Sequence, residues 1–252
     1  MIKADHITKQ FEDGHLVLDD VSAVFHEGKT NLIIGQSGSG KTVLLKCLVG
    51  LHEVNSGEVL FDNLCFTAMT IEERKIVRQK MGMIFQGGAL FDSLTVEENV
   101  RFPLDFFTDL PLSDKQDIVN ACLKRVNLSN AASLYPSEIS GGMIKRTSIA
   151  RAVVNNPKYL FCDEPNSGLD PQTSIIIDNL IKEITIEYNI TTIINTHDMN
   201  SVMQIGDSVI FIHEGKKWWE GDRETILHSD NKELNDFVFA SEMAKRAKMN
   251  MK

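Results

Sequence analysis

The stretch GQSGSGKT, residues 35–42, matches the G-x-x-x-x-G-K-[ST] pattern of a phosphate-binding loop. It follows the apolar run NLIIG and opens the helical pattern KTVLLKCLV, so a strand, a glycine-rich turn and a helix are expected in succession. Glycines let the backbone wrap around a phosphate, and amide N–H groups at the helix start then point at the anion. We expect the following residues to bind a nucleotide: Gly35, Gln36, Ser37, Gly38, Ser39, Gly40, Lys41, Thr42 and Val43.

Two side chains of this loop have distinct expected roles. Lys41 should reach the β- and γ-phosphates, and Thr42 should offer its hydroxyl to Mg²⁺. A magnesium site also needs an acid, and the run YLFCDEP places Asp163 and Glu164 at the end of an apolar strand. Ligands bind at the carboxyl ends of strands in α/β sheets. Asp163 is therefore the expected magnesium partner, and Glu164 the general base that polarises an attacking water.

The order of elements predicts an α/β fold. Strand-like runs such as LVLDDVSAVF, GEVLF and MGMIF alternate with helical patterns, which favours a largely parallel sheet. From about Thr95 to Asn156 the patterns are helical and without strands, as if a helical block were inserted into the sheet. One of these helices, SDKQDIVNACLKRV, is expected to open with Ser113 as its capping serine.

Composition excludes several classes of protein. A net charge of −9 over 252 residues argues against a nucleic-acid partner. The four cysteines form no CxxC pair, which argues against a disulfide framework or a zinc site and fits a reducing compartment. No stretch approaches the roughly 18 consecutive apolar residues needed to span a bilayer. We therefore expect any membrane role to come through a partner.

The run SEISGGMIKRTSIARA resembles the signature sequence of the ABC-type ATPases, usually written LSGGQ. Ile139 replaces the leucine and Met143 the glutamine. The phosphate loop, Gln86, this signature, DEP, SGLD and His197 follow one another as in that family, over nearly all of the chain. The resemblance implies one ABC ATPase domain with a RecA-like P-loop core, a mixed sheet and an inserted helical subdomain. The implied core is residues 1–86 and 157–230, the helical subdomain 87–156, and the C-terminal helical tail 231–252.

The resemblance also implies how the nucleotide is held. In the family two subunits meet head to tail, with ATP between the phosphate loop of one and the signature of the other. A homodimer is implied, in which a nucleotide on the other copy is contacted by Ser140, Gly141, Gly142 and Met143.

Four further roles are carried over from the family. Gln86 would sense the γ-phosphate and Mg²⁺, and His197 would contact the γ-phosphate as the switch histidine. Asp170, in NSGLDP, would couple the two sites across the dimer. Phe11 stands where the family places an aromatic ring that stacks on adenine, although a phenylalanine of the core would look the same in sequence.

Two features resemble the ATPases of MCE-associated (Mla-type) phospholipid transporters. One is Met143 followed by Arg146, and the other is the segment Phe85–Leu104. The resemblance implies an ATPase on the cytoplasmic face of the bacterial inner membrane, held by a permease through residues 86–104 and YPSE. An MCE-type protein would handle the lipid.

Other functions stay open at this point. An ABC ATPase of this kind can energise an importer of small molecules such as amino acids or metals, or a complex that moves no substrate and controls a cell-wall enzyme. A soluble ABC protein of DNA repair or translation is disfavoured, since the chain has neither a second cassette nor a long coiled-coil insertion. A solvated C-terminal tail is the default, although its basic residues could also contact anionic headgroups, a helix end or the other subunit: Lys245, Arg246, Lys248 and Lys252.

Overall fold

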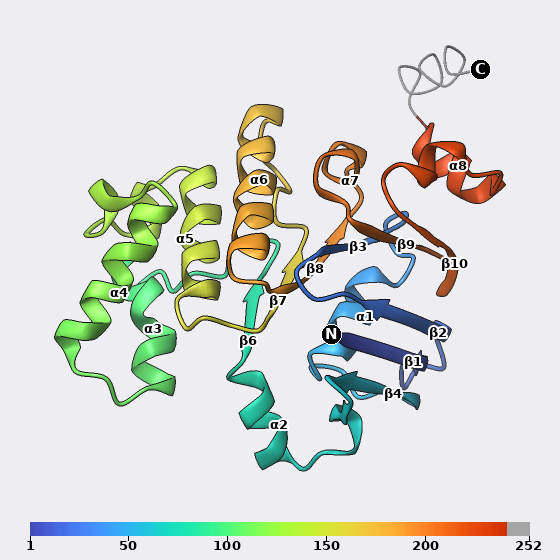
Figure 1. The fold of residues 1–252 in the computed structure, drawn as a ribbon, viewed down its shortest axis with the longest axis horizontal. Coiled ribbons are helices and arrows are strands. Elements are labelled where there is room, and N and C mark those ends of the chain that lie inside the picture. The colour runs from blue at the N-terminus through green and yellow to red at the C-terminus, as the bar shows by residue number, and fades with distance from the viewer. Residues whose placement is uncertain (241–252) are drawn as a thin grey trace.

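Two β-sheets organise residues 1–240, the part of the chain that this computed structural model describes (Figure 1). The larger sheet has six strands in the order β10-β9-β3-β8-β7-β6. Only β10 runs antiparallel to its neighbour in this sheet, so the sheet is mixed, as the sequence predicts. Its strands are β3 (Thr30–Ile34), β6 (Met81–Ile84), β7 (Tyr159–Asp163), β8 (Thr191–Thr196), β9 (Ser208–His213) and β10 (Lys216–Gly221).

The smaller sheet is antiparallel and has the order β2-β1-β4-β5. Its strands are β1 (Ile2–Gln10), β2 (Leu16–Phe25), β4 (Ser56–Phe61) and β5 (Leu64–Cys65). Helix α1 (Lys41–Leu48) packs between this sheet and the larger one, and its buried leucines join a core with Phe25, Phe61 and Phe161. The 3₁₀ turn η1 (Phe66–Ala68) and helix α2 (Ile71–Arg78) complete this side of the molecule.

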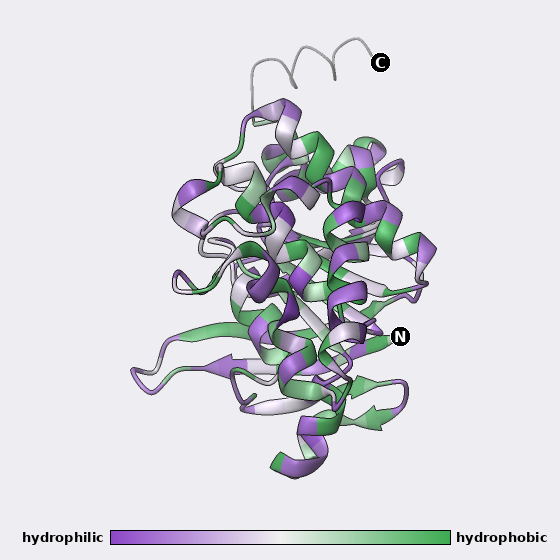
Figure 2. Cartoon of the chain, turned by 90° about the vertical axis from the view of Figure 1, so that its left-hand side faces the viewer, coloured by the Kyte–Doolittle hydropathy of each residue, from purple (hydrophilic) through white to green (hydrophobic). Residues whose placement is uncertain are grey.

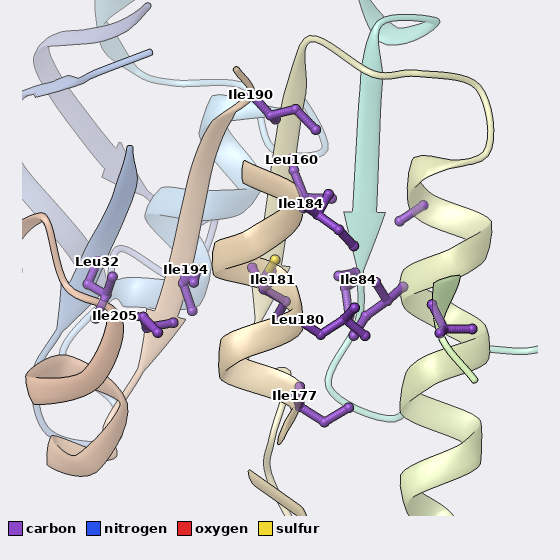
Figure 3. Close-up of a cluster of buried hydrophobic side chains, with 14 of the residues drawn as sticks. Leu32, Ile84, Leu160, Ile177, Leu180, Ile181, Ile184, Ile190, Ile194 and Ile205 are labelled. Atoms are coloured by element: carbon purple, nitrogen blue, oxygen red, sulfur yellow. The ribbon is translucent and has the colours of Figure 1, made fainter. Parts of the chain in front are cut away.

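The central strands are buried on both faces, which explains why they read as continuous apolar runs. Because side chains alternate along a strand, Leu32 and Ile34 of β3 enter one core while Ile33 enters the other. Helices α6 (Pro171–Glu187) and α7 (Met199–Ile205) cover the face opposite α1. Figure 3 shows Ile177, Ile181 and Ile184 of α6 among the isoleucines and leucines of this second core. Each such buried side chain contributes about 2 kcal/mol to folding.

Three helices pack beyond β6, at the end of the large sheet (Figure 1). They are α3 (Val96–Phe107), α4 (Leu112–Arg125) and α5 (Gly141–Val153), with the 3₁₀ turns η2 (Ser129–Ala131) and η3 (Pro136–Glu138) between α4 and α5. Helix α3 begins with a capping box between Thr95 and Glu98. The described residues of this block hold no strand, as the sequence predicts. The exact boundaries of a helical subdomain at 87 and 156 stay a prediction.

The capping role predicted for Ser113 is wrong. Helix α4 begins earlier, at Leu112, with Pro111 as its N-cap residue. The proline ring holds φ at −57°, close to the helical value, so the helix can start directly behind it. Ser113 lies inside the first turn, and its hydroxyl donates to Asp114 instead.

The last described elements are the 3₁₀ turn η4 (Thr225–His228) and helix α8 (Lys232–Val238), which lies beside β10. Asn231 caps α8 by accepting from the amide of Leu234. The helical tail predicted for residues 231–252 stays a prediction, and its basic residues at 245, 246, 248 and 252 lie outside the described residues. Within residues 1–240, the structure has no helix with the length and hydropathy required to cross a bilayer.

Helix α6 buries one acidic side chain, Asp178, within its apolar surface. Asp178 is 2% exposed, and burial raises the pKa of its carboxyl to about 6. The negative charge of Asp198 adds to this increase, and hydrogen bonds from Ser201 and Asn166 oppose it. The folded protein therefore holds this proton more tightly than the unfolded chain does. The free energy of unfolding consequently falls as the pH rises from about 4 to 6, and this cost persists at higher pH.

The substitution Asp178→Asn removes this desolvation cost. At pH 7.5 we expect the free energy of unfolding to exceed that of the parent protein by about 1–3 kcal/mol, which corresponds to the raised pKa. The difference in the free energy of unfolding between variant and parent should become smaller toward pH 4.5, where the parent carboxyl is protonated in the folded state. Urea denaturation at the two pH values measures it. The same difference at both values would contradict the raised pKa.

Candidate active site

The predicted site residues come together at one edge of the large sheet. The glycine-rich loop follows β3, Gln86 follows β6, Asp163 ends β7 and His197 follows β8. Strands β3, β8, β7 and β6 are neighbours and parallel, so their carboxyl ends lie side by side. This edge is where α/β sheets bind ligands.

The loop before α1 has the conformation that a phosphate cradle requires. Gly38 and Gly40 have φ values of 80° and 106°, in the left-handed region that glycine adopts without strain. A Cβ atom at Gly35 would lie 2.2 Å from the carbonyl oxygen of Ile212, so no larger residue fits there. A cavity of about 280 Å³ opens over the loop, lined by Val17, Ser37, Gly38, Gly40, Lys41, Thr42, Val43, Gln86 and Glu164. The exposed backbone and the ammonium group in this cavity fit a phosphate.

Lys41 supplies positive charge at the base of this cavity. Its ammonium donates to the backbone oxygen of Gln36 at 2.8 Å. Burial lowers the pKa of Lys41, while the nearby carboxylates of Glu164 and Asp163 act in the opposite direction. An ammonium with little solvation interacts strongly with an anion, which suits contact with a phosphate.

Oxygen atoms suited to Mg²⁺ gather beside Lys41. The hydroxyl of Thr42 donates to the carboxylate of Asp163 at 3.1 Å. The amide nitrogen of Asn195 donates to this carboxylate at 2.6 Å and to the Thr42 hydroxyl at 2.9 Å. The buried Oδ1 of Asn195 has no hydrogen-bond partner among the described residues. Hydroxyl, carboxylate and amide oxygens are the ligands that magnesium prefers, so these residues fit the ion.

Glu164 lies between two other residues predicted for catalysis, His197 and Gln86. Its Oε1 is 2.9 Å from Nδ1 of His197, and its Oε2 accepts from Nε2 of Gln86 at 3.1 Å. Its backbone is left-handed, with φ of 47°, which is rare for a residue with a side chain. The amide of Glu164 is held by the carbonyl of Asn195 at 2.9 Å. The three predicted residues therefore meet at one carboxylate, whose orientation is set by strand β8.

The signature residues lie at the start of α5. Ser140 caps this helix by accepting from the amide of Met143, and Gly141 and Gly142 form its first turn. None of the four lines the cavity over the glycine-rich loop of the same chain. This is the arrangement expected if they serve a nucleotide held by another copy, and that role stays a prediction.

The remaining two predicted residues have local roles that the structure shows. Asp170 caps α6 by accepting from the amides of Gln172 and Thr173, both at 3.0 Å. The ring of Phe11 packs edge-on against His52, with a centroid distance of 5.4 Å. Phe11 is not among the residues that line the cavity. Coupling by Asp170 and adenine stacking by Phe11 stay predictions.

Sequence reasoning missed the residues that hold these groups in place. Asn195 touches both Thr42 and Asp163, and its signal was a polar residue inside the apolar strand TTIINT. Helix α5 contributes two cations, the buried Lys145 and the partly buried Arg151. Lys145 donates to the backbone oxygen of Gln86, and Arg151 donates to those of Gly88 and Ala89, at 2.7 Å each. Burial lowers the pKa of both cations, with Glu164 opposing this at Lys145.

The comparisons with known proteins agree with this geometry. Residues 18–167 match the family model described as ABC transporter. The chain belongs to the ABC transporter family. Accordingly it is an ATPase of the ABC type, with ATP and Mg²⁺ as its cofactors. ATPases of this family work as dimers with membrane permease partners.

Among its relatives is the methionine import ATP-binding protein MetN of Desulfitobacterium hafniense, 38% identical over 96% of this chain and 73% of that protein. Another is MlaF of Haemophilus influenzae, the ATP-binding protein of an intermembrane phospholipid transport system. It is 37% identical over 94% of this chain and 90% of that protein. Among solved structures, the dimeric ATP-binding cassette MJ0796 with ADP and Pi superposes with a TM-score of 0.81. It is 31% identical, over 88% of this chain and 99% of that one.

The contact of Lys145 with Gln86 predicts the effect of removing the ammonium. In Lys145→Met the backbone of Gln86 loses a charged hydrogen bond, so kcat for ATP hydrolysis should fall about tenfold. ATP affinity should change little, because the glycine-rich loop is untouched. Steady-state hydrolysis and nucleotide titration measure the two effects. The exposed lysine of α4 supplies the control, Lys124→Met, which should match the parent. Equal kcat values for both variants would contradict a role for Lys145.

Proposed function

We propose that this chain is the ATP-hydrolysing subunit of a membrane transporter that moves phospholipid in the bacterial envelope. It works as a homodimer, held on the cytoplasmic face of the inner membrane by a permease, with an MCE-type lipid-binding protein in the same complex. The observation that carries the proposal is an apolar groove directly beside the Gln86 loop.

In the proposed reaction Glu164 orients the attacking water and accepts its proton. Gln86 and His197 hold the two oxygens of this carboxylate. Lys41 and the loop amides stabilise charge on the transferred phosphoryl group. Magnesium is held by Thr42, Asp163 and Gln86. The second copy completes each site through its signature residues, Asp170 couples the two sites, and Phe11 stacks on adenine.

The groove has the features of a docking site for an apolar helix. A cavity of about 420 Å³ lies between β6, α3 and the end of α5. Phe91 and Phe102 form one wall, with ring centroids 4.7 Å apart, and Phe106 is 66% exposed. Figure 2 views the molecule from the side of helices α3 to α5, whose ribbons carry both hydrophobic and hydrophilic residues. Exposed apolar surface of this extent is typical of a binding site for another protein.

Buried polar contacts make the groove rigid. Asn99 is fully buried, and it exchanges hydrogen bonds with the backbone of Phe91 at 2.8 and 3.1 Å. Arg151 holds Gly88 and Ala89 from the opposite side. Phe85, which precedes Gln86, lines the groove as well. A permease segment in the groove would therefore lie next to the residue that contacts Glu164, which supports a link between docking and hydrolysis.

Phospholipid is the proposed substrate for two reasons. Met143 and the segment Phe85–Leu104 resemble the ATPases of MCE-type systems, and the phospholipid-transport relative MlaF is matched over 90% of its length. The similarity to the methionine-import ATPase MetN supports the second candidate, a small-molecule importer.

Replacing the proposed general base tests the catalytic assignment. Glu164→Gln keeps the size of the side chain and a hydrogen bond to Gln86 but cannot accept a proton. We expect it to bind ATP with parent affinity, to lose hydrolysis by about a hundredfold or more, and to accumulate as a closed dimer. Nucleotide titration, phosphate release and size-exclusion chromatography with ATP measure these effects. Full turnover would remove Glu164 from the role of base.

A charge placed in the groove tests the docking surface. Phe102→Asp should abolish co-purification of the permease from detergent-solubilised membranes, because a carboxylate cannot be buried against an apolar helix. The matched control is Ile71→Asp on α2, a 77% exposed position outside the groove. It should co-purify the permease as the parent does. Recovery of the permease by Phe102→Asp would place docking elsewhere.

The same co-purification, with mass spectrometry of proteins and lipids, tests the substrate. A permease together with an MCE protein that carries phospholipid supports the proposal. A permease accompanied by a methionine-binding protein, without phospholipid, would transfer the assignment to the importer.

A further inference from the structure

A buried polar cluster joins helix α6 to the segments that follow Glu164 and His197. Asn166, Asp178 and Ser201 are 7%, 2% and 1% exposed. The side-chain amide of Asn166 donates to the Ser201 hydroxyl at 2.8 Å and to the Asp178 carboxylate at 3.3 and 3.4 Å. Ser201 hydrogen-bonds this carboxylate too. The three side chains come from three separate segments of the chain and are hydrogen-bonded to one another.

Two of the three segments lead directly to a residue of the candidate active site. Asn166 follows Glu164 by two positions, and Ser201 lies in helix α7, four positions after His197. The two segments are therefore joined twice. The first contact joins Glu164 to His197 at 2.9 Å, and the histidine side chain there is largely exposed. The second contact is the buried cluster.

We propose that Asp178 is a positioning residue for ATP hydrolysis, which locks the segment of Glu164 to the helix that follows His197. This inference rests on the roles proposed for Glu164 and His197. Asp178 is suited to the task because α6 is a fixed frame. Ile177 and Ile181 anchor this helix in the core on either side of Asp178, and Asp170 caps its start. The loop between Asn166 and α6 is the SGLD segment, so the cluster also holds one end of that loop.

An apolar residue at position 178 would avoid the cost of burying a carboxylate. It would also remove the carboxylate that accepts from the Asn166 amide and from the Ser201 hydroxyl, and so leave two buried donors without this partner. Two other titratable groups face the cluster, the Asp198 carboxylate at the start of α7 and the buried Cys162 thiol of β7. Neither forms a hydrogen bond with the Asn166 amide. Asp178 is thus the acceptor that holds the two segments together.

Two substitutions at position 178 test the inference in the permease complex obtained by the co-purification above. Asp178→Val removes the acceptor. We expect kcat for ATP hydrolysis to fall about tenfold or more, with KM for ATP changed less than about twofold, because the glycine-rich loop is not involved. Asp178→Asn keeps an acceptor of the same shape, so its kcat should stay within about threefold of the parent at pH 7.5. Loss in the first variant and rescue by the second is the expected result.

Thr185→Val is the matched control on the same helix. Thr185 is fully buried, and its hydroxyl bonds the carbonyl of Ile181 and the hydroxyl of Thr192, which lies at the end of β8 farther from His197. This variant removes a buried hydrogen bond of α6 without touching the cluster, and its kcat should equal that of the parent. An equal loss of kcat in Thr185→Val and Asp178→Val would overturn the inference, because general damage to α6 would then be the cause.

A milder variant keeps the test decisive if Asp178→Val does not fold. Ser201→Ala deletes one hydroxyl of the cluster, and kcat should fall about threefold at unchanged KM for ATP. Parent kcat in Ser201→Ala, or in a folded Asp178→Val, would overturn the inference. Glu164→Gln in the same assay distinguishes a failure of the positioning role of Asp178 from a failure of the catalytic role of Glu164. If it is inactive while Asp178→Val is fully active, only the positioning role fails, whereas an active Glu164→Gln overturns both proposals.

Discussion

The parallel pairing of β7 with β8 is the constraint on which the rest of the site depends. Its register places Asp163 opposite Asn195, and this asparagine then bonds both Asp163 and Thr42. Through Thr42 the same contact joins the strand ends to the first turn of α1 and hence to the glycine-rich loop. The carbonyl of Asn195 also holds the amide of Glu164 in a left-handed conformation. A slip of one residue would turn Asn195 to the opposite face and separate these groups.

Two helices outside the strands hold the Gln86 loop and the segments of Glu164 and His197. Helix α5 begins at the signature and reaches the Gln86 loop through Lys145 and Arg151, which donate to backbone oxygens of this loop. Helix α6 begins at Asp170 and reaches the segments of Glu164 and His197 through Asp178. Each helix therefore has one end at the proposed dimer interface and a polar contact at the nucleotide end of the sheet. This arrangement gives a physical basis for coupling between partner, signature and base.

Prediction from sequence succeeded where local chemistry decides the outcome. A phosphate loop needs glycines, a lysine and a hydroxyl in a row, and the structure confirms its strand–loop–helix setting. Ser113 failed because a neighbouring proline with a fixed φ started the helix first. Asn195, Lys145 and Asp178 were missed because each has a partner far away in the sequence, 32, 59 and 12 positions from it in the bonds to Asp163, Gln86 and Asn166.

By itself the sequence determined the class of fold, the phosphate loop and the identity of the acids at the end of β7, because these follow from residue types at short, fixed spacings. Only the tertiary structure decided which polar side chains are buried and what they hold. Lys145 and Asp178 occur in helices where a charged residue ordinarily faces solvent, and packing instead places them against the catalytic loops. Burial strengthens such contacts because water no longer competes for them, and no local pattern records it.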